Sequence, residues 1–456
     1  MAVTGTRSAP SSWEGAKDLR TVSTTTAAAL AVADMIGIGV FTSLGFQVQG
    51  IPSAFSVLML WVVGGVTALC GALSYAELAT ALPRSGGEYN FLSRIFGRAV
   101  GFMAGWVSAT VGFAAPIALA AMAFGQYFAG VVPGAPPLLL GLAVAWVIGL
   151  VHLRGVEMGA TFHNASTALK LILIVGLIVA GFAFGTPQPI SFAPTAADLG
   201  YMSGAPFAVG LVFVMYAYSG WNAATYIAGE VRDPQRSLPI ALVTGTLIVA
   251  VLYVLLNAVF LYTTPMDAMA GQIDIGLIAG THIFGDTGGR LIGALICIGL
   301  ISAISAMTWI GPRVTMVMGE DFPLLRVFAR KSKAGVPAVA ILLQLAVTTL
   351  LLLTGSFEAV LEYIQFSLTL CSFLAVLGVI VLRVTQPDLP RPYRVHGYPL
   401  VPLVFLAVTG FMLYYLVRER PVESLASIAT LLAGLGVYFV SVLQARRTGA
   451  RETLDP

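Results

Sequence analysis

The sequence predicts an all-α membrane protein with twelve transmembrane helices. Hydrophobic residues make up 58% of the 456 residues and charged residues only 10%, so the chain is far more apolar than a water-soluble domain. Its apolar stretches reach about 20 residues, the length of a helix that crosses the hydrocarbon core. They also lack the period-two alternation of outer-membrane strands. Lipid is therefore expected to cover most of the outer surface.

Twelve apolar stretches are long enough to be drawn as spans. They are expected at 24–48, 53–81, 98–130, 136–153, 164–185, 203–229, 238–262, 289–318, 337–355, 359–383, 399–417 and 424–445. Basic residues gather in the loops on one side of these spans, and by the positive-inside rule this places both termini in the cytoplasm. The net charge of +3 thus reflects membrane orientation and does not indicate a nucleic-acid partner.

Glycine interrupts two of the spans near their middles. The first contains Gly37, Ile38 and Gly39, and the sixth contains the segment 218–222. Because an offset of five spans reverses the direction through the membrane, equivalent breaks indicate two inverted five-helix repeats followed by two extra helices. The predicted organisation is a cytoplasmic tail at 1–22, a first repeat at 23–195, a second repeat at 196–385, helices eleven and twelve at 386–446 and a cytoplasmic tail at 447–456.

A helix that unwinds inside a bilayer indicates a binding site. The freed amides and carbonyls cost several kcal/mol each unless a polar partner satisfies them. A zwitterionic amino acid supplies both partners: its carboxylate accepts from amides at a half-helix start, here those of Gly37, Ile38 and Gly39, and its ammonium donates to unpaired carbonyls. Glycines that only permit close helix packing are the alternative, and the second break in span six favours the site.

Several segments resemble the amino acid–polyamine–organocation transporters, and within them the L-type amino acid carriers. The matching segments are Gly37–Phe41, Tyr75–Leu78, Pro83–Tyr89 and Tyr216–Asn222, with Glu230, Pro234, Pro239, Arg313 and Pro323 at fitting positions. The resemblance covers the first ten helices in order. It implies a LeuT-like fold with broken first and sixth helices and transport by alternating access. It also implies that the substrate ammonium meets carbonyls near Met35, Tyr216, Ala217 and Ser219, with Tyr216 as an aromatic gate.

Lys170 is the most informative charge within a span. An ammonium two turns into span five either snorkels to the membrane surface or finds polar partners inside the bundle. In several members of the family a lysine of this helix stands where sodium-driven relatives hold a sodium ion. Lys170 is therefore expected to act as a fixed cation or in proton coupling, with Ser302 and Ser305 of span eight as its partners.

Two residues of the first break depart from the family pattern. Asp34 stands where the family is usually uncharged; its carboxylate either pairs with Lys170, or favours a cationic substrate, or is neutral and hydrogen-bonded to nearby backbone. Ile38 stands where relatives often carry a serine or threonine hydroxyl, which indicates looser substrate selection.

Further residues near the breaks have expected roles. Trp221 is interpreted either as a lid over the site or as an interfacial anchor, and Asn222 is expected to bond the substrate or the opened backbone. Glu77 is expected to bond loop amides or Arg84. Residues 87–96 are predicted to form a short amphipathic helix at the cytoplasmic interface, with Glu88 on its polar side.

The sequence shows no pattern of a metal, nucleotide or catalytic site. His152, His163, His282 and His396 lie in separate loops, without the spacing of metal ligands. The chain has no phosphate-binding loop that would use ATP and no potassium filter motif. Neither a cofactor nor an enzyme activity is expected, and transport would be driven by gradients or exchange.

The predicted function is secondary transport of amino acids across the cell inner or plasma membrane, either proton-coupled or by exchange. A carrier of polyamines or other organic cations that uses Asp34 is one alternative, and an amino-acid sensor without transport is another. Mammalian L-type carriers are linked to a glycoprotein through a cysteine between spans three and four. Residues 131–137 contain no cysteine, so no disulfide-linked heavy chain is expected.

Overall fold

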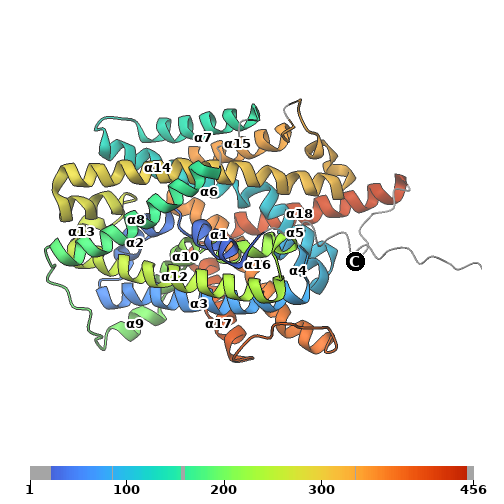
Figure 1. The fold of residues 1–456 in the computed structure, drawn as a ribbon, viewed down its shortest axis with the longest axis horizontal. Coiled ribbons are helices and arrows are strands. Elements are labelled where there is room, and N and C mark those ends of the chain that lie inside the picture. Colours follow the sequence, from blue (N-terminus) through green and yellow to red (C-terminus); the bar gives the residue numbers. More distant parts are fainter. Residues whose placement is uncertain (1–21, 85, 156–159, 334, 449–456) are drawn as a thin grey trace, which may run out of the picture.

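The computed structural model describes residues 22–84, 86–155, 160–333 and 335–448. Apart from Val22 and residues 447–448, the two predicted tails lie outside these ranges. The described chain is a bundle of helices in which α3 (Ala54–Ala81), α12 (Pro234–Thr263) and α14 (Ile275–Asp321) run along the long axis of the molecule (Figure 1). The extended pairing within these ranges is a single bridge between Val22 and Val231.

Within the described residues, eight helices are long and apolar enough to cross a membrane, or nine if one bent pair forms a single span. The eight are Ala54–Ala81, Arg98–Val131, Asn164–Phe184, Pro234–Thr263, Ile275–Asp321, Phe357–Thr385, Leu400–Glu419 and Pro421–Gln444. In Figure 1 these are α3, α5 with α6, α8, α12, α14, α16, α17 and α18. The chain is therefore an all-helical protein that passes the membrane many times, as its composition predicts.

Shorter helices complete the bundle. Three are apolar, namely α7 (Pro137–Leu153), α10 (Ala205–Ala217) and α15 (Ala338–Leu353). Other short elements are α4 (Gly87–Phe96), α9 (Asp198–Ser203), α11 (Ala223–Tyr226), α13 (Met266–Met269), the 3-10 helices Ala228–Glu230 and Pro323–Ala329, and the π-helix Ser108–Gly112 that joins α5 (Arg98–Val107) to α6.

Local sequence explains where many of these helices begin. Ser23, Ser53 and Ser356 each accept a hydrogen bond from a backbone amide three residues later and so cap α1 (Thr24–Met35), α3 and α16 (Phe357–Thr385). Proline opens α7 and α12, because its missing N–H is not needed in the first turn of a helix.

The first predicted span is a bent pair of helices. Helix α1 ends at Met35, α2 (Gly39–Gly50) begins three residues after Ile36, and the two axes differ by 42°. Residues 36–38 link them as a bend that is not helical. Two glycines, Gly37 and Gly39, lie at the break, and no side chain caps the start of α2. These two features explain why the helix opens here.

The sixth predicted span is also interrupted. Helix α10 ends at Ala217, and α11 begins at Ala223 after a turn of five residues. Gly220 in this turn has a φ of +101°, a left-handed conformation that glycine adopts without steric cost. The segment before α1 and the segment after α11 are joined as well, since the Val22 amide donates to the Glu230 carbonyl at 3.0 Å and the Arg232 amide to the Val22 carbonyl at 2.8 Å.

Two parts of the sequence interpretation need correction. Residues 275–284, which lie between the predicted seventh and eighth spans, form the first part of α14 before a kink at Gly285, because Ile275 and Ala279 are buried against neighbouring helices. Helix α4 forms over the predicted residues, but Glu88, expected on its polar side, is buried with an exposed fraction of 9%, and so is the neighbouring Asn90 with 5%.

The packing places both breaks in the interior of the bundle. Helix α12 packs against α1 and α3, α14 packs against α6 (Ala114–Val131), α7 and α8 (Ala160–Phe184), and α10 packs against α2. Figure 1 shows α1, α2 and α10 among these longer helices. The breaks are thus enclosed by apolar helices, and a polar group there is surrounded by protein and not by lipid.

Candidate functional site

The two helix breaks are in direct contact at Gly39 and Ala217. A Cβ atom added at Gly39 would lie 2.5 Å from the Ala217 Cα, so the first residue of α2 packs on the last residue of α10. The start of α2 presents free amides, and the end of α10 presents free carbonyls. Opposite ends of two helix dipoles therefore meet at this point.

A second contact joins the breaks at Gly220. A Cβ atom there would lie 2.6 Å from Oδ2 of Asp34 and 3.0 Å from the amide nitrogen of Met35. Both the positive φ and this close approach require glycine. The turn after α10 thus lies against the last turn of α1, and the four half-helices converge on one small region.

Some of the freed backbone groups are already bonded inside the protein. The Met35 carbonyl accepts from the Tyr253 hydroxyl at 2.6 Å and from the Gly37 amide at 2.7 Å. The Tyr216 carbonyl accepts from the Ser219 hydroxyl at 2.6 Å and the Ser219 amide at 3.0 Å. Since a carbonyl oxygen has two lone pairs, these two predicted ammonium acceptors are saturated in this conformation.

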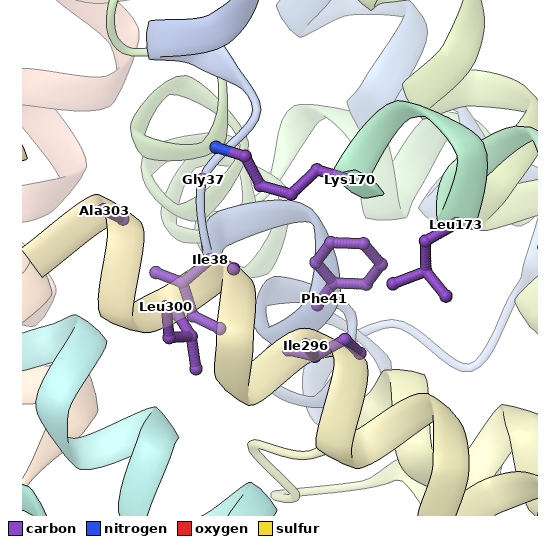
Figure 2. A pocket seen from close by; sticks show the side chains of 9 residues that line it. Gly37, Ile38, Phe41, Lys170, Leu173, Ile296, Leu300 and Ala303 are labelled. Carbon is purple, nitrogen blue, oxygen red and sulfur yellow. The ribbon is translucent and has the colours of Figure 1, made fainter. Parts of the chain in front are cut away.

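Lys170 lies in the first break and does not snorkel. Its Nζ donates to the Ile36 carbonyl at 2.6 Å, and Figure 2 shows the side chain reaching from α8 to the linker beside Gly37. A Cβ at Gly299 would lie 3.2 Å from the Lys170 Cγ, so this glycine leaves room for the lysine stem. The ammonium therefore stabilises a backbone carbonyl that the broken helix leaves without its own donor.

A small cavity adjoins Lys170 between the first break and α14. Its lining includes Gly37, Ile38, Phe41, Lys170 and Leu300 (Figure 2), and its volume is about 10 Å³. That is close to the least space that holds one water molecule. The cavity is therefore too small for an amino acid, and it corresponds to the region between spans one and eight where a fixed cation was expected.

Asp34 is exposed although it lies beside Gly220 in the last turn of α1. Thr26 and Leu30, at spacings of four residues on the same helix, are exposed as well. These residues share one face of α1, and that face is accessible up to the break. Tyr226 of α11 is 40% exposed. The junction of the two breaks is therefore accessible from the side where α1 begins.

The predicted site residue Asn222 belongs to a hydrogen-bond network centred on the buried carboxylate of Glu88. Its side-chain amide donates to Oε1 of Glu88 at 3.1 Å. The same carboxylate accepts from the hydroxyl groups of Tyr75 at 2.7 Å, Tyr226 at 2.9 Å and Ser372 at 3.1 Å. These donors come from α3, α11, α16 and the second break, so Glu88 joins α4 to the turn that carries the site.

Sequence reasoning missed the role of Glu88. Its place in an amphipathic pattern indicated a solvated polar face, whereas the structure buries it. The available signal was its position next to two glycines, because Gly87 lets α4 approach the Tyr226 ring, and a Cβ at Gly87 would lie 2.6 Å from that ring.

The two aromatic residues of the predicted site are buried. Tyr216 is 6% exposed and Trp221 is 4% exposed. The Trp221 ring packs edge-on against Tyr75 at 4.6 Å and against Phe405 at 6.2 Å between ring centroids. In this conformation Trp221 fixes the second break to α3 and α17 (Leu400–Glu419).

The structure places one of the two serines of α14 beside a histidine. Ser302 and Ser305 were expected to be partners of Lys170, but Lys170 bonds to Ile36, and the Ser305 hydroxyl lies 2.9 Å from Nε2 of His152. Both serines are buried.

Two other buried carboxylates form ion pairs. Oε1 of Glu77 accepts from Arg383 at 2.9 Å and Oε2 accepts from the Val395 amide at 2.7 Å, so the expected loop amide is present but Arg383 takes the place of Arg84. Glu362 is 1% exposed and lies 3.0 Å from Nε of Arg420. Both pairs lie outside the junction of the two breaks.

Comparison with known proteins identifies similar chains over most of this length. Residues 22–438 match a family model described as amino acid permease. The chain is 29% identical over 431 residues to the b(0,+)-type amino acid transporter 1 of Mus musculus, covering 90% of this chain and 85% of that protein. It is 28% identical over 419 residues to the serine/threonine exchanger SteT of Bacillus subtilis, covering 90% and 94%. It is also 28% identical over 439 residues to the large neutral amino acids transporter small subunit 2 of Homo sapiens, covering 91% and 79%.

Proposed function

Because the chain belongs to the amino acid permease family, whose relatives are transporters rather than enzymes, we propose that it carries amino acids across a cell membrane by alternating access. The substrate would be held where the two helix breaks meet. The observation that carries this proposal is the contact of Gly39 with Ala217 and of Gly220 with Asp34. It brings the free amides of one half-helix and the free carbonyls of another to one place.

An amino acid has the right charges for this junction. Its carboxylate would accept from the amides of Ile38 and Gly39 at the uncapped start of α2. Its ammonium would donate to the carbonyls of Ala217 and Ser219, because those of Met35 and Tyr216 are already bonded within the protein. Since these contacts are to the backbone, they would suit any α-amino acid, and side-chain selection would come from the surrounding residues.

Counting the three shorter apolar helices as spans gives the proposed topology. The bent pair, the eight long helices and α7, α10 and α15 would make twelve spans, with breaks in the first and the sixth. This arrangement is what two inverted five-helix repeats plus two further helices require, with the repeats at 23–195 and 196–385 and the last helices at 386–446. Both termini would lie in the cytoplasm of a cell whose plasma membrane holds the protein.

In the proposed alternating-access cycle, the conformation of this structure would be the inward-facing one. The accessible face of α1 leads to Asp34 from the side where α1 begins, which is the proposed cytoplasmic side. The opposite side is closed: the Gly271 amide donates to the Gly45 carbonyl at 2.9 Å, and the Phe46 ring stacks on Phe213 and Phe357 at 5.0 and 5.6 Å. Transport would require this closed side to open while α1 closes.

Lys170 supports coupling without sodium. Its ammonium occupies the region between the first break and α14 and bonds to Ile36, so it would supply a fixed positive charge there. We propose exchange or proton coupling as the source of energy, and the name of the Bacillus subtilis relative, an exchanger, favours exchange. No disulfide-linked partner is expected, because residues 132–136 between α6 and α7 contain no cysteine.

A second candidate function is transport of organic cations, and Asp34 favours it. Its carboxylate is exposed at the junction of the breaks, where it would attract a cationic side chain or a polyamine. A competition series would separate the two functions. Neutral amino acids that compete for uptake and a polyamine that does not would support the first.

Counterflow in proteoliposomes tests the proposed function. Purified protein is reconstituted into vesicles loaded with one unlabelled amino acid, and entry of the labelled form is followed against protein-free vesicles. The proposal expects entry that depends on the loaded amino acid. Binding of amino acids in a thermal-shift screen with no counterflow for any of them would contradict transport and would indicate a sensor.

A further inference from the structure

One arginine at the end of α17 holds two carboxylates at the start of α16. Glu358 and Glu362 are four residues apart and therefore lie on the same face of α16. Nη2 of Arg420 donates to Oε1 of Glu358, and Nε of Arg420 lies 3.0 Å from Oε1 of Glu362. A single guanidinium thus ties the first two turns of α16 to the end of α17.

The two ion pairs differ in burial. The Glu358 side chain is 32% exposed, whereas the Glu362 side chain is 1% exposed. Within the described residues, no other group forms a hydrogen bond to either carboxylate oxygen of Glu362. An exposed ion pair contributes little to stability, but a buried carboxylate that loses its compensating charge is strongly destabilising. Compensation of Glu362 is therefore the main effect of Arg420.

The backbone of Arg420 is fixed on both sides. Its amide donates to the Leu416 carbonyl at 2.9 Å, and its carbonyl accepts from the Ser424 amide at 3.0 Å. Arg420 thus lies at the junction of α17 and α18 (Pro421–Thr448). The guanidinium extends to α16 from this fixed point.

The part of α16 that Arg420 holds also carries an aromatic contact. Phe357 directly precedes Glu358, is 3% exposed, and stacks on Phe46 of α2 with ring centroids 5.6 Å apart and planes 4° apart. Phe46 also stacks on Phe213 of α10 at 5.0 Å. These rings close the proposed outer side, so the position of the first turn of α16 determines whether this closure is complete.

We propose that Arg420 is a positioning residue of this closure. By compensating the buried charge of Glu362, it holds the start of α16 against α17 and so keeps Phe357 on Phe46. Only the role of this side as a gate rests on the proposed transport function. The link between the ion pair and the aromatic contact can be measured without transport.

Hydrogen–deuterium exchange of the full chain in detergent, read by mass spectrometry, tests this link. Arg420→Gln leaves Glu362 without its compensating charge. We expect the amides of residues 358–366 and 44–50 to exchange at least about tenfold faster, because the start of α16 and the outer end of α2 open locally. Exchange in α12 should not change, whereas a general loss of stability would raise it as well.

Arg418→Gln is the matched control. Arg418 lies near the same end of α17, but its side chain is 64% exposed and pairs with the adjacent Glu419. This variant should exchange like the unmodified protein. Exchange in Arg420→Gln that is no faster than in Arg418→Gln would overturn the proposal.

The double variant Glu362→Gln/Arg420→Gln tests the cause. It removes the uncompensated charge, so exchange at the start of α16 should return to within about twofold of the unmodified protein. Exchange as fast as in Arg420→Gln alone would show that Arg420 does not act through Glu362. If Arg420→Gln does not fold, a folded double variant supports the proposal and an unfolded one contradicts it.

Counterflow in proteoliposomes connects the closure to transport. Each cycle must close the outer side, so Arg420→Gln should slow counterflow by roughly fivefold, and the double variant should recover it. Loss of counterflow in Arg420→Gln without recovery in the double variant would contradict the role of the ion pair. Absence of counterflow in the unmodified protein would instead contradict the proposed function and leave the exchange result to decide the role of Arg420.

Discussion

The ammonium of Lys170 donates a hydrogen bond to the carbonyl oxygen of Ile36 at 2.6 Å. This bond connects α8 to the linker between α1 and α2, where the helix cannot supply its own donor. A buried carbonyl without a partner is costly, so Lys170 both holds the opened linker and places a positive charge beside it.

Replacing this lysine should impair transport. We expect Lys170→Ala to lower the counterflow rate by roughly tenfold, equivalent to about 1.4 kcal/mol in the barrier, and to change its pH dependence. Rates measured across a pH series in proteoliposomes check this prediction. A variant with the rate and the pH profile of the unmodified protein would remove Lys170 from the mechanism.

The contact between the breaks predicts the effect of a single methyl group. Gly39→Ala places a Cβ 2.5 Å from the Ala217 Cα, and overpacking of this kind destabilises a protein by about 1–3 kcal/mol. We expect a lower melting temperature and loss of counterflow. The matched control is Gly176→Ala in α8, where nothing lies within 4 Å of the added Cβ. This variant should retain transport. Similar behaviour of the two variants would mean that the breaks do not pack as described.

The network around Glu88 predicts a large effect of a nearly isosteric change. Glu88→Gln replaces one acceptor oxygen with an amide that must face hydroxyl donors from Tyr75, Tyr226 or Ser372. Each buried group left unsatisfied costs about 1–3 kcal/mol, so thermal stability and transport should both fall. The exposed residue Glu320 provides the control, and Glu320→Gln should stay within about 0.5 kcal/mol. Full activity of Glu88→Gln would argue against a link between α4 and the site.

The exposed carboxylate of Asp34 predicts a change in substrate preference. We expect Asp34→Asn to reduce uptake of cationic relative to neutral amino acids by up to about fivefold, the size of an exposed charge interaction. The ratio of kcat/KM for lysine and leucine measures this effect. An unchanged ratio would show that Asp34 does not select the side chain.

Asp198 predicts how stability depends on pH. It lies outside the spanning segments, and hydrogen bonds from Ser53, Ser56 and Thr195 lower the pKa of its carboxyl below the ordinary value of 3.8. A carboxyl with a lowered pKa stabilises the folded state above its unfolded pKa, and this stability is lost as the pH falls toward the folded pKa.

Melting curves of Asp198→Asn test the direction of this dependence of stability on pH. The variant should be less stable than the unmodified protein at neutral pH, and the difference should shrink as the pH falls below about 4. Asp267→Asn, at an exposed position of α13, is the control. A stability difference that grows on acidification would contradict the assignment.

The helix breaks could be predicted from local sequence. Glycines within an apolar stretch, as at Gly37, Gly39 and Gly220, are a strong local signal, because unwinding at such residues is inexpensive. The position of α4 was also predictable from its amphipathic pattern. Both features depend on neighbouring residues alone.

Long-range pairings could not be predicted in the same way. Glu77 bonds to Arg383, 306 residues away, and Glu88 bonds to Ser372, 284 residues away. Ser305 bonds to His152 on another helix. Such partners depend on the rotation and depth of each helix, which a hydrophobic pattern does not determine. The helical residues before Gly285 were missed because glycine and polar residues interrupt their apolar pattern.

A structure determined with a transported amino acid bound would show whether the junction of the two breaks holds the substrate. We expect the carboxylate within hydrogen-bonding distance of the amides of Ile38 and Gly39, and the ammonium at the carbonyls of Ala217 and Ser219. A ligand bound elsewhere in the bundle, or a first or sixth span that is continuous through the membrane, would contradict the proposed mechanism.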